Sequence, residues 1–224
     1  MSSRRVVLGL KVVLWLGALA PLAWMIAGFF LDWLGANPIE KLEHVTGMTG
    51  IIILLASLAV TPVRRITGWN PLIQLRRPLG LFAFFYIFLH FGVWMGLDLG
   101  LEPSWVWDDI KERPYITVGF TGFLLMIPLA VTSTKGWMRR LGRRWGRLHT
   151  LVYVVAALGC IHYYWLVKSD VRIPLLLATI YGTLMALRIP GWVRKWARGR
   201  RDRAGGTART TVRGYGDRAA VGGD

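Results

Sequence analysis

Cysteine is almost absent from this chain. Cys160 is the only one, so no disulfide can form within the chain. Acidic residues are also few, 12 against 28 Lys and Arg, and charged residues of both signs make up only 18% of the sequence. These shortages exclude a disulfide scaffold, a disordered chain and an ordinary soluble domain. Cys160 lies inside an apolar run, where we expect a small buried core residue.

The chain is rich instead in long apolar runs, and hydrophobic residues make up 54% of it. The hydrocarbon core of a membrane takes about 20 apolar residues in a helix. Six runs reach or approach this length: 12–31, 44–63, 78–97, 115–131, 148–167 and 173–187. They lack the period-two alternation of strands. We therefore predict an all-α integral membrane protein with six transmembrane helices in a bundle.

Prolines occur within these runs and at their ends. Pro21 and Pro128 lie within spans and are expected to kink them, whereas Pro62 and Pro78 are expected to mark span ends. Pro21 also follows the only small-residue pattern that could serve as a signal-peptide cleavage site, which argues against cleavage. The first run is therefore predicted to stay in place as a membrane span.

The basic residues lie between the apolar runs and mostly on one side. Successive connections between spans are assigned alternately to the two sides of the membrane. With this assignment, 23 of the 28 Lys and Arg fall on the side of the two termini, and nine of the 12 acids fall on the other side. By the positive-inside rule, both termini are predicted to be cytoplasmic. The net charge of +16 then sets topology and attracts membrane lipid, so no nucleic-acid partner is expected.

The last residues differ in composition from the rest. Residues 199–224 are rich in glycine and arginine and have almost no apolar content. We predict a six-helix membrane domain over 1–198 and a disordered basic cytoplasmic tail over 199–224.

Of the four histidines, His90 and His162 lie well inside predicted spans, where an ionisable or metal-binding side chain indicates function. His90 is 13 residues beyond Arg77 and His162 is 15 beyond Arg147, which places them about 20 and 22 Å from the basic side at ~1.5 Å per residue. Two imidazoles at one depth on different helices favour a b-type haem held at both axial positions. The alternative is a pair of buried histidines bonded to backbone carbonyls.

His149 is 13 residues before His162, about 20 Å closer to the cytoplasm and some 140° away around an ideal helix. A shared face would require a local distortion, which Gly159 could allow. The corresponding position on the third span is Arg77, which is not an axial ligand. His149 can therefore bind a second haem asymmetrically, contact a flavin or quinone, or interact with haem propionates. His44 is predicted to be an interfacial residue at a helix start.

Two connections carry further candidate surfaces. On the basic side, the five arginines could hold a flavin phosphate or could only set topology: Arg76, Arg77, Arg143, Arg144 and Arg147. On the other side, Trp105 and Trp107 lie among five acids in the connection between the third and fourth spans. This tryptophan pair could anchor a protein partner or could lie in the lipid headgroup layer.

Five segments carry a family resemblance in the order LEHVTGMTG, VTPVRRITG, LRRPLGLFAFFYIFLH, RPYITVGFTGFLLMIPLAVTS and RRLGRRWGRLHTLVYVVAALGCIHYYW. Over about residues 35–190 the chain resembles the haem-binding membrane subunit of the periplasmic methionine-sulfoxide reductase system, the MsrQ (YedZ) family. That family belongs to the ferric-reductase-like transmembrane superfamily.

The resemblance implies a six-helix cytochrome of the bacterial inner membrane with one or two haem b groups and FMN. It implies electron transfer from quinol to a periplasmic molybdopterin-containing reductase subunit, in a heterodimer that repairs methionine sulfoxide in oxidised proteins. The chain would then be an electron-transfer subunit rather than the catalytic one. The implied ligands are His90, His149 and His162. Arg77 stands where a fourth ligand would be, which is a departure from two-haem relatives.

Other classes of function remain open at this point. One alternative is a ferric-reductase or oxidase-type cytochrome fed by a separate cytoplasmic flavin reductase. Another is a non-redox membrane assembly protein, which would leave the depth-matched histidines unexplained. Transporters and pumps are disfavoured, because the acids appear only in connections or at span edges.

Overall fold

The computed structural model describes residues 3–189, and over that range the chain is helical with no strand. The contacts divide the chain into two units, 1–182 and 183–224. The main helices are α1 (Ser3–Phe30), α2 (Pro38–Thr67), α3 (Ile73–Val93), α5 (Pro114–Val131), α8 (Leu151–Leu166) and α9 (Arg172–Ala186). The shorter ones are η1 (Asn70–Leu72), η2 (Trp94–Asp98), α4 (Pro103–Glu112), α6 (Lys135–Leu141) and α7 (Arg143–Leu148). The predicted tail over 199–224 lies outside the described residues.

Among the described residues, five helical segments are long and apolar enough to cross a membrane. They are Arg5–Phe30, Pro38–Thr67, Asn70–Asp98, Pro114–Val131 and Arg143–Leu166. The sixth predicted run folds as α9, an apolar helix of 15 residues that is shorter than the other five. The prediction of an all-α membrane protein is therefore confirmed.

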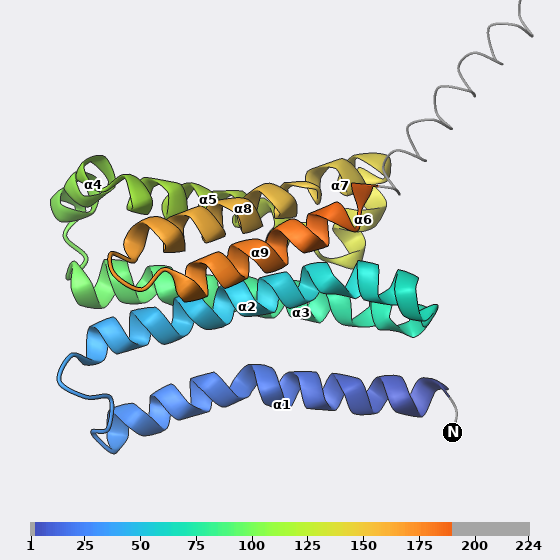
Figure 1. The fold of residues 1–224 in the computed structure, drawn as a ribbon, viewed down its shortest axis with the longest axis horizontal. Helices are drawn as coiled ribbons and strands as arrows, with labels where there is room; N and C mark the ends of the chain where they lie inside the picture. The colour runs from blue at the N-terminus through green and yellow to red at the C-terminus, as the bar shows by residue number, and fades with distance from the viewer. Residues whose placement is uncertain (1–2, 190–224) are drawn as a thin grey trace, which may run out of the picture. The chain divides into compact units, whose positions relative to one another are not determined.

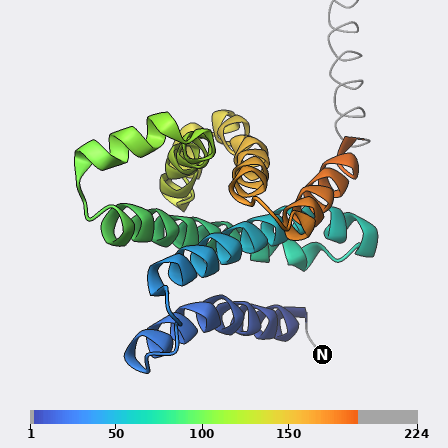
Figure 2. The same ribbon diagram turned by 60° about the vertical axis from the view of Figure 1, so that its left-hand side comes forward.

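Three layers of helices make up the first unit. The α2 and α3 helices pack against each other along their length, and so do α5 and α8 (Figure 1). The α1 helix lies on the opposite side of the α2–α3 pair from α5 and α8, as both ribbon views show (Figure 2). The space among α2, α3, α5 and α8 is where the candidate site lies.

The helices extend beyond the apolar runs. The α2 helix begins after Asn37, whose side chain accepts a hydrogen bond from the Glu40 N–H at 3.3 Å, and ends at Gly68 with φ +69°. Pro62 lies inside α2 and Pro78 inside α3, so the prediction that they mark helix ends is wrong. Each proline removes a single N–H, and a long membrane helix tolerates this loss.

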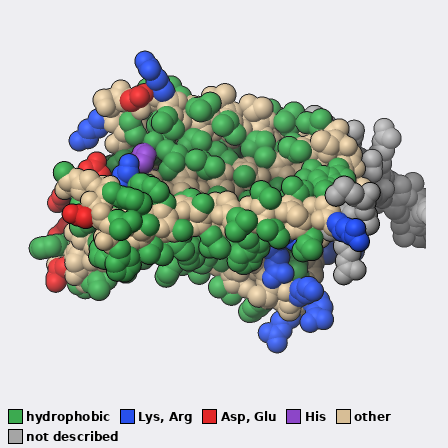
Figure 3. All heavy atoms as spheres, turned by 90° about the horizontal axis from the view of Figure 1, so that it is seen from below, with side chains coloured by type: hydrophobic (Ala, Val, Ile, Leu, Met, Phe, Trp, Pro, Cys, Tyr) green, Lys and Arg blue, Asp and Glu red, His purple; other side chains and the backbone are tan. Residues whose placement is uncertain are grey.

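Charge is segregated between the two ends of the first unit. All nine Asp and Glu among the described residues lie at the end that carries the α1–α2 loop, α4 and the α8–α9 loop, which we call the acidic end. Figure 3 shows red acidic side chains gathered at this end, with some blue Lys and Arg side chains among them, and further blue side chains without red ones at the opposite, basic end. The chain therefore alternates between two ends of opposite charge.

Candidate functional site

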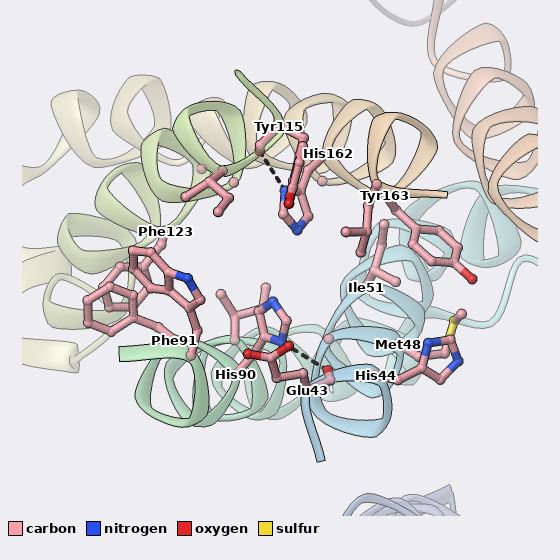
Figure 4. A pocket seen from close by; sticks show the side chains of 18 of the residues that line it. Glu43, His44, Met48, Ile51, His90, Phe91, Tyr115, Phe123, His162 and Tyr163 are labelled. Carbon is pink, nitrogen blue, oxygen red and sulfur yellow. Dashed lines mark hydrogen bonds between the residues drawn. The ribbon is translucent and has the colours of Figure 1, made fainter. Parts of the chain in front are cut away.

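A cavity of about 670 Å³ lies among α2, α3, α5 and α8 near the acidic end. His90 of α3 and His162 of α8 line it, and both rings point into it from opposite sides (Figure 4). Their ring centres are 6.2 Å apart, with ring planes at 74°. The expectation that these two histidines lie at one depth is confirmed.

Hydrogen bonds determine which ring nitrogens face the cavity. The Nδ1 of His90 lies 3.0 Å from the carbonyl oxygen of Glu43, and the Nδ1 of His162 lies 2.7 Å from that of Tyr115. A carbonyl can only accept, so each Nδ1 carries the proton and donates it. Each Nε2 is then a bare acceptor, and Figure 4 shows both directed into the space between the rings. This is the tautomer that binds a metal through Nε2.

Two glycines let these rings sit close to neighbouring helices. A Cβ at Gly47 of α2 would lie 3.1 Å from Nδ1 and Cε1 of His90. A Cβ at Gly119 of α5 would lie only 2.6 Å from Nδ1 of His162. Neither position has room for a larger residue unless the ring moves, so both glycines help to fix the imidazoles.

The cavity wall beside the histidines is aromatic. Phe91 stacks on Phe123 with ring centres 4.5 Å apart, and Phe120 lies 5.9 Å from Phe91. Ile51 of α2 also lines the cavity. These side chains form a largely apolar surface around two polar groups, as expected of a site for a large, mostly apolar cofactor.

The donor set fits a haem better than a free metal ion. A metal bound by protein side chains alone takes three or four ligands, and the described residues contain no group of three or more His, Cys, Asp or Glu that could hold one. A haem brings the macrocycle nitrogens and takes one or two axial ligands from the protein. Imidazole nitrogens bind metals at about 2 Å, so rings 6.2 Å apart can hold one iron between them.

Glu43 is a site residue that the sequence analysis missed. It lies inside α2, lines the cavity and orients His90 through its backbone carbonyl (Figure 4). Its Oε1 is buried and has no hydrogen-bond partner among the described residues. Sequence analysis placed Glu43 at a span edge. Its role depends on a carbonyl contact with a histidine 47 residues further along the chain, which leaves no local signal in the sequence.

His44 follows Glu43 but faces another direction. Its side chain is exposed at the rim of the cavity, and its ring centre lies 6.4 Å from that of Tyr163. It lies near the start of α2, as expected for an interfacial residue.

His149 lies away from this cavity, at the break between α7 and α8. The helix is interrupted at His149 and Thr150, whereas Gly159 lies within α8. The His149 ring stacks on Trp145, with ring centres 4.1 Å apart, and its Nε2 lies 3.1 Å from the Thr132 hydroxyl. That hydroxyl donates to the Pro128 carbonyl at 2.6 Å, so Nε2 carries the proton and Nδ1 is the bare nitrogen.

The arginines of the basic end lie near the ends of the helices there. Arg77 is exposed in the first turns of α3, and Arg76 beside it is half-buried. Arg143, Arg144 and Arg147 are exposed on α7. The structure therefore places Arg77 at the end of the bundle opposite the histidine cavity.

Comparison with known proteins gives one family match. Residues 46–160 match the family described as ferric reductase like transmembrane component. This segment includes α3 and α5 entirely and contains His90, but it ends before His162.

Individual relatives match more of the chain. A protein of Xanthomonas euvesicatoria pv. vesicatoria, named protein-methionine-sulfoxide reductase heme-binding subunit MsrQ, is 46% identical over 189 residues, which cover 82% of this chain and 87% of the relative. A protein of the same name from Caulobacter vibrioides is 47% identical over 178 residues, 79% of this chain and 85% of the relative. A Xanthomonas campestris pv. campestris protein, also of this name, is 46% identical over 198 residues, 86% of this chain and 90% of the relative.

Proposed function

Since this chain belongs to the MsrQ family of haem-binding subunits, within the ferric-reductase-like membrane proteins, we propose that it carries electrons through a b-type haem to a methionine-sulfoxide reductase partner. The observation that supports this most directly is the pair of bare Nε2 atoms of His90 and His162 on opposite sides of one cavity. These two histidines are the proposed axial ligands.

The residues around the pair have supporting roles. The carbonyls of Glu43 and Tyr115 hold the two rings in one tautomer and raise the basicity of each Nε2. The Phe91–Phe123 stack gives the site an apolar wall. His90 and His162 would hold the haem, which would supply one-electron transfer when bound.

The proposed topology has six spans and both termini in the cytoplasm of a bacterium. The charge segregation supports it, because the basic end suits the cytoplasmic face by the positive-inside rule. In this arrangement α9 is the sixth span, residues 1–198 form the membrane domain, and 199–224 form a cytoplasmic tail. The acidic end and the histidine cavity then face the periplasm.

The proposed electron source is quinol, and FMN carried by this chain is proposed to bind at the basic end. Arg77, with its neighbour Arg76 and the arginines of α7, supplies positive charge for a flavin phosphate. His149 can contact the flavin or quinone, or bind a second haem through Nδ1, from a position between the basic end and the cavity. The proposed electron acceptor is a periplasmic molybdopterin-containing reductase subunit, paired with this chain as a heterodimer.

Spectra of detergent-purified variants test these assignments. We expect His90→Ala and His162→Ala each to abolish the low-spin b-type bands, because the loss of either axial ligand leaves the iron five-coordinate or the site without haem. His149→Ala should keep those bands and lose the donor-driven reduction of the haem. Arg77→Gln should reduce the flavin that copurifies with the protein.

Each result that differs from these rejects a stated part of the proposal. Full low-spin haem in both His90→Ala and His162→Ala would reject the ligand pair, and wild-type protein with no haem would favour the assembly-protein alternative. Unchanged flavin content in Arg77→Gln would remove Arg77 from the flavin site. In the wild-type protein, the haem could be reduced only by a separate cytoplasmic flavin reductase and not be oxidised by the methionine-sulfoxide reductase subunit. This result would favour the ferric-reductase type of cytochrome. Far-UV circular dichroism of each variant controls for folding.

A further inference from the structure

The α4 helix is held rigidly at the acidic end by the buried Asp109. Its Oδ2 accepts a hydrogen bond from the indole Nε1 of Trp94 at 3.0 Å, and its Oδ1 pairs with Nε of Arg113 at 3.0 Å. The hydroxyl of Thr117 on α5 also donates to the carbonyl of Ile110. These bonds tie α4 to η2 on one side and to α5 on the other, so its outward face has a fixed orientation.

One side of α4 carries an exposed tryptophan between carboxylates, which we call the Trp105 face (Glu102, Trp105, Asp108 and Glu112). These residues follow at intervals of three, three and four, which places them along one side of a helix. Trp105 is 60% exposed, and neither Asp108 nor Glu112 has an ion-pair partner within residues 3–189. The Trp105 face is therefore a large aromatic ring among uncompensated negative charges.

Trp107 differs from Trp105 although both are exposed. At 100° per residue the two lie about 200° apart around α4, so they occupy opposite flanks. The ammonium of Lys111 lies over the Trp107 ring, 4.8 Å from its centre. The two tryptophans therefore do not form one surface, although the sequence analysis considered them together as a pair. Only the Trp105 face has unpaired charges beside its ring.

The α4 helix that carries the Trp105 face is linked to the histidine cavity through its buried Asp109. Trp94 and Arg113, the two residues that bind Asp109, both line the cavity. A partner seated on α4 would thus be separated from the cavity by few side chains, as electron transfer requires. Anionic lipid surfaces attract basic segments and repel acidic ones, so three carboxylates suit a protein partner better than the headgroup layer.

We propose that the Trp105 face is the docking site for the reductase partner, and that the partner contributes a basic patch with an arginine that stacks on Trp105. This inference rests on the proposed function. A guanidinium can lie on an indole face and pair with a neighbouring carboxylate at the same time, and here Asp108 and Glu112 supply the carboxylates. Opposite charges on the two surfaces would also speed their encounter.

Stopped-flow mixing of the reduced holoprotein with the purified reductase subunit tests the proposal. We expect the second-order rate of haem oxidation to fall about tenfold in the double variant Asp108→Asn with Glu112→Gln at low salt, and the difference from wild type to vanish at high salt. Trp105→Ala should also slow oxidation about tenfold, at every salt concentration, because stacking is screened little.

Trp107→Ala is the matched control, since it removes an equally exposed tryptophan from the other flank of the same helix. It should oxidise within about twofold of wild type. All variants should keep the haem spectrum and the donor-driven reduction. Wild-type rates in the Trp105-face variants would overturn the docking site and assign Trp105 to lipid. An equal loss in Trp107→Ala would overturn it as well, because the effect would then not be specific to the Trp105 face. A wild-type protein that contains haem but is never oxidised by the subunit would instead reject the proposed function, and the docking site with it.

Discussion

Gly119 determines how close the His162 ring can come to α5. A methyl group at this position would lie 2.6 Å from Nδ1 and 2.9 Å from Cε1 of that ring, so the ring would have to move and weaken its bond to the Tyr115 carbonyl. Overpacking of this kind costs about 1–3 kcal/mol. We expect Gly119→Ala to weaken haem binding by about 5- to 150-fold, measured by haem titration of the purified protein.

Gly92 provides the control for that substitution. It is also a helical glycine, two residues after His90, and a Cβ there would meet nothing within 4 Å. Gly92→Ala should therefore bind haem like wild type. If both alanine variants titrate alike, the tight contact at Gly119 does not position His162.

At the residue scale, the sequence predicted which histidines meet but not how they are held. Counting residues from Arg77 and Arg147 was enough to match the depths of His90 and His162. The carbonyls that fix the two tautomers lie 47 residues away from them in the sequence, on other helices. Such long-range backbone contacts leave no local pattern, so the roles of Glu43 and Tyr115 required the structure.

Among the helices, α1 is attached to its neighbours by an unusual backbone contact. The hydroxyl of Tyr86 on α3 donates to the carbonyl of Ala18 at 2.5 Å and accepts from the N–H of Leu22 at 3.2 Å. It thus bonds both members of the helical pair Ala18 and Leu22, beside the Pro21 position predicted to be kinked. The fully buried Tyr86 side chain therefore joins α1 to α3.

We expect Tyr86→Phe to lower the free energy of unfolding by about 1–3 kcal/mol, because the Ala18 carbonyl and Leu22 N–H lose their partner away from water. Thermal unfolding in detergent, followed by circular dichroism, measures this as a lower midpoint. Tyr164→Phe removes a hydroxyl from an exposed tyrosine and is the control. An unchanged midpoint in Tyr86→Phe would mean that this contact does not contribute to stability.

The apolar runs predicted the long helices because burial in lipid leaves a helix as the only way to satisfy the backbone. The apolar runs did not predict α4, α6 or α7. These helices lie in connections that are too short and too polar to give the hydropathy signal of a span. Helix ends were also misjudged. The α2 helix begins six residues before the run at 44–63, since Asn37 and Pro38 start it in polar surroundings.

For the whole molecule, the opposed charges of the two ends predict one orientation in the membrane. In a Cys160→Ala background, which removes the only native thiol, Ser104→Cys marks α4 at the acidic end and Gly136→Cys marks α6 at the basic end. We expect a membrane-impermeant maleimide to label Ser104→Cys in intact spheroplasts and Gly136→Cys only after lysis. The reverse pattern would invert the proposed topology.

The facing imidazoles of His90 and His162 also bear on biosynthesis. A group bound by both Nε2 atoms would join α3 to α8, whose histidines are already held by carbonyls of α2 and α5. A group that binds only the folded state stabilises that state by mass action. Membrane proteases degrade chains that unfold. The amount of this protein that accumulates in a cell should therefore follow the supply of haem during growth.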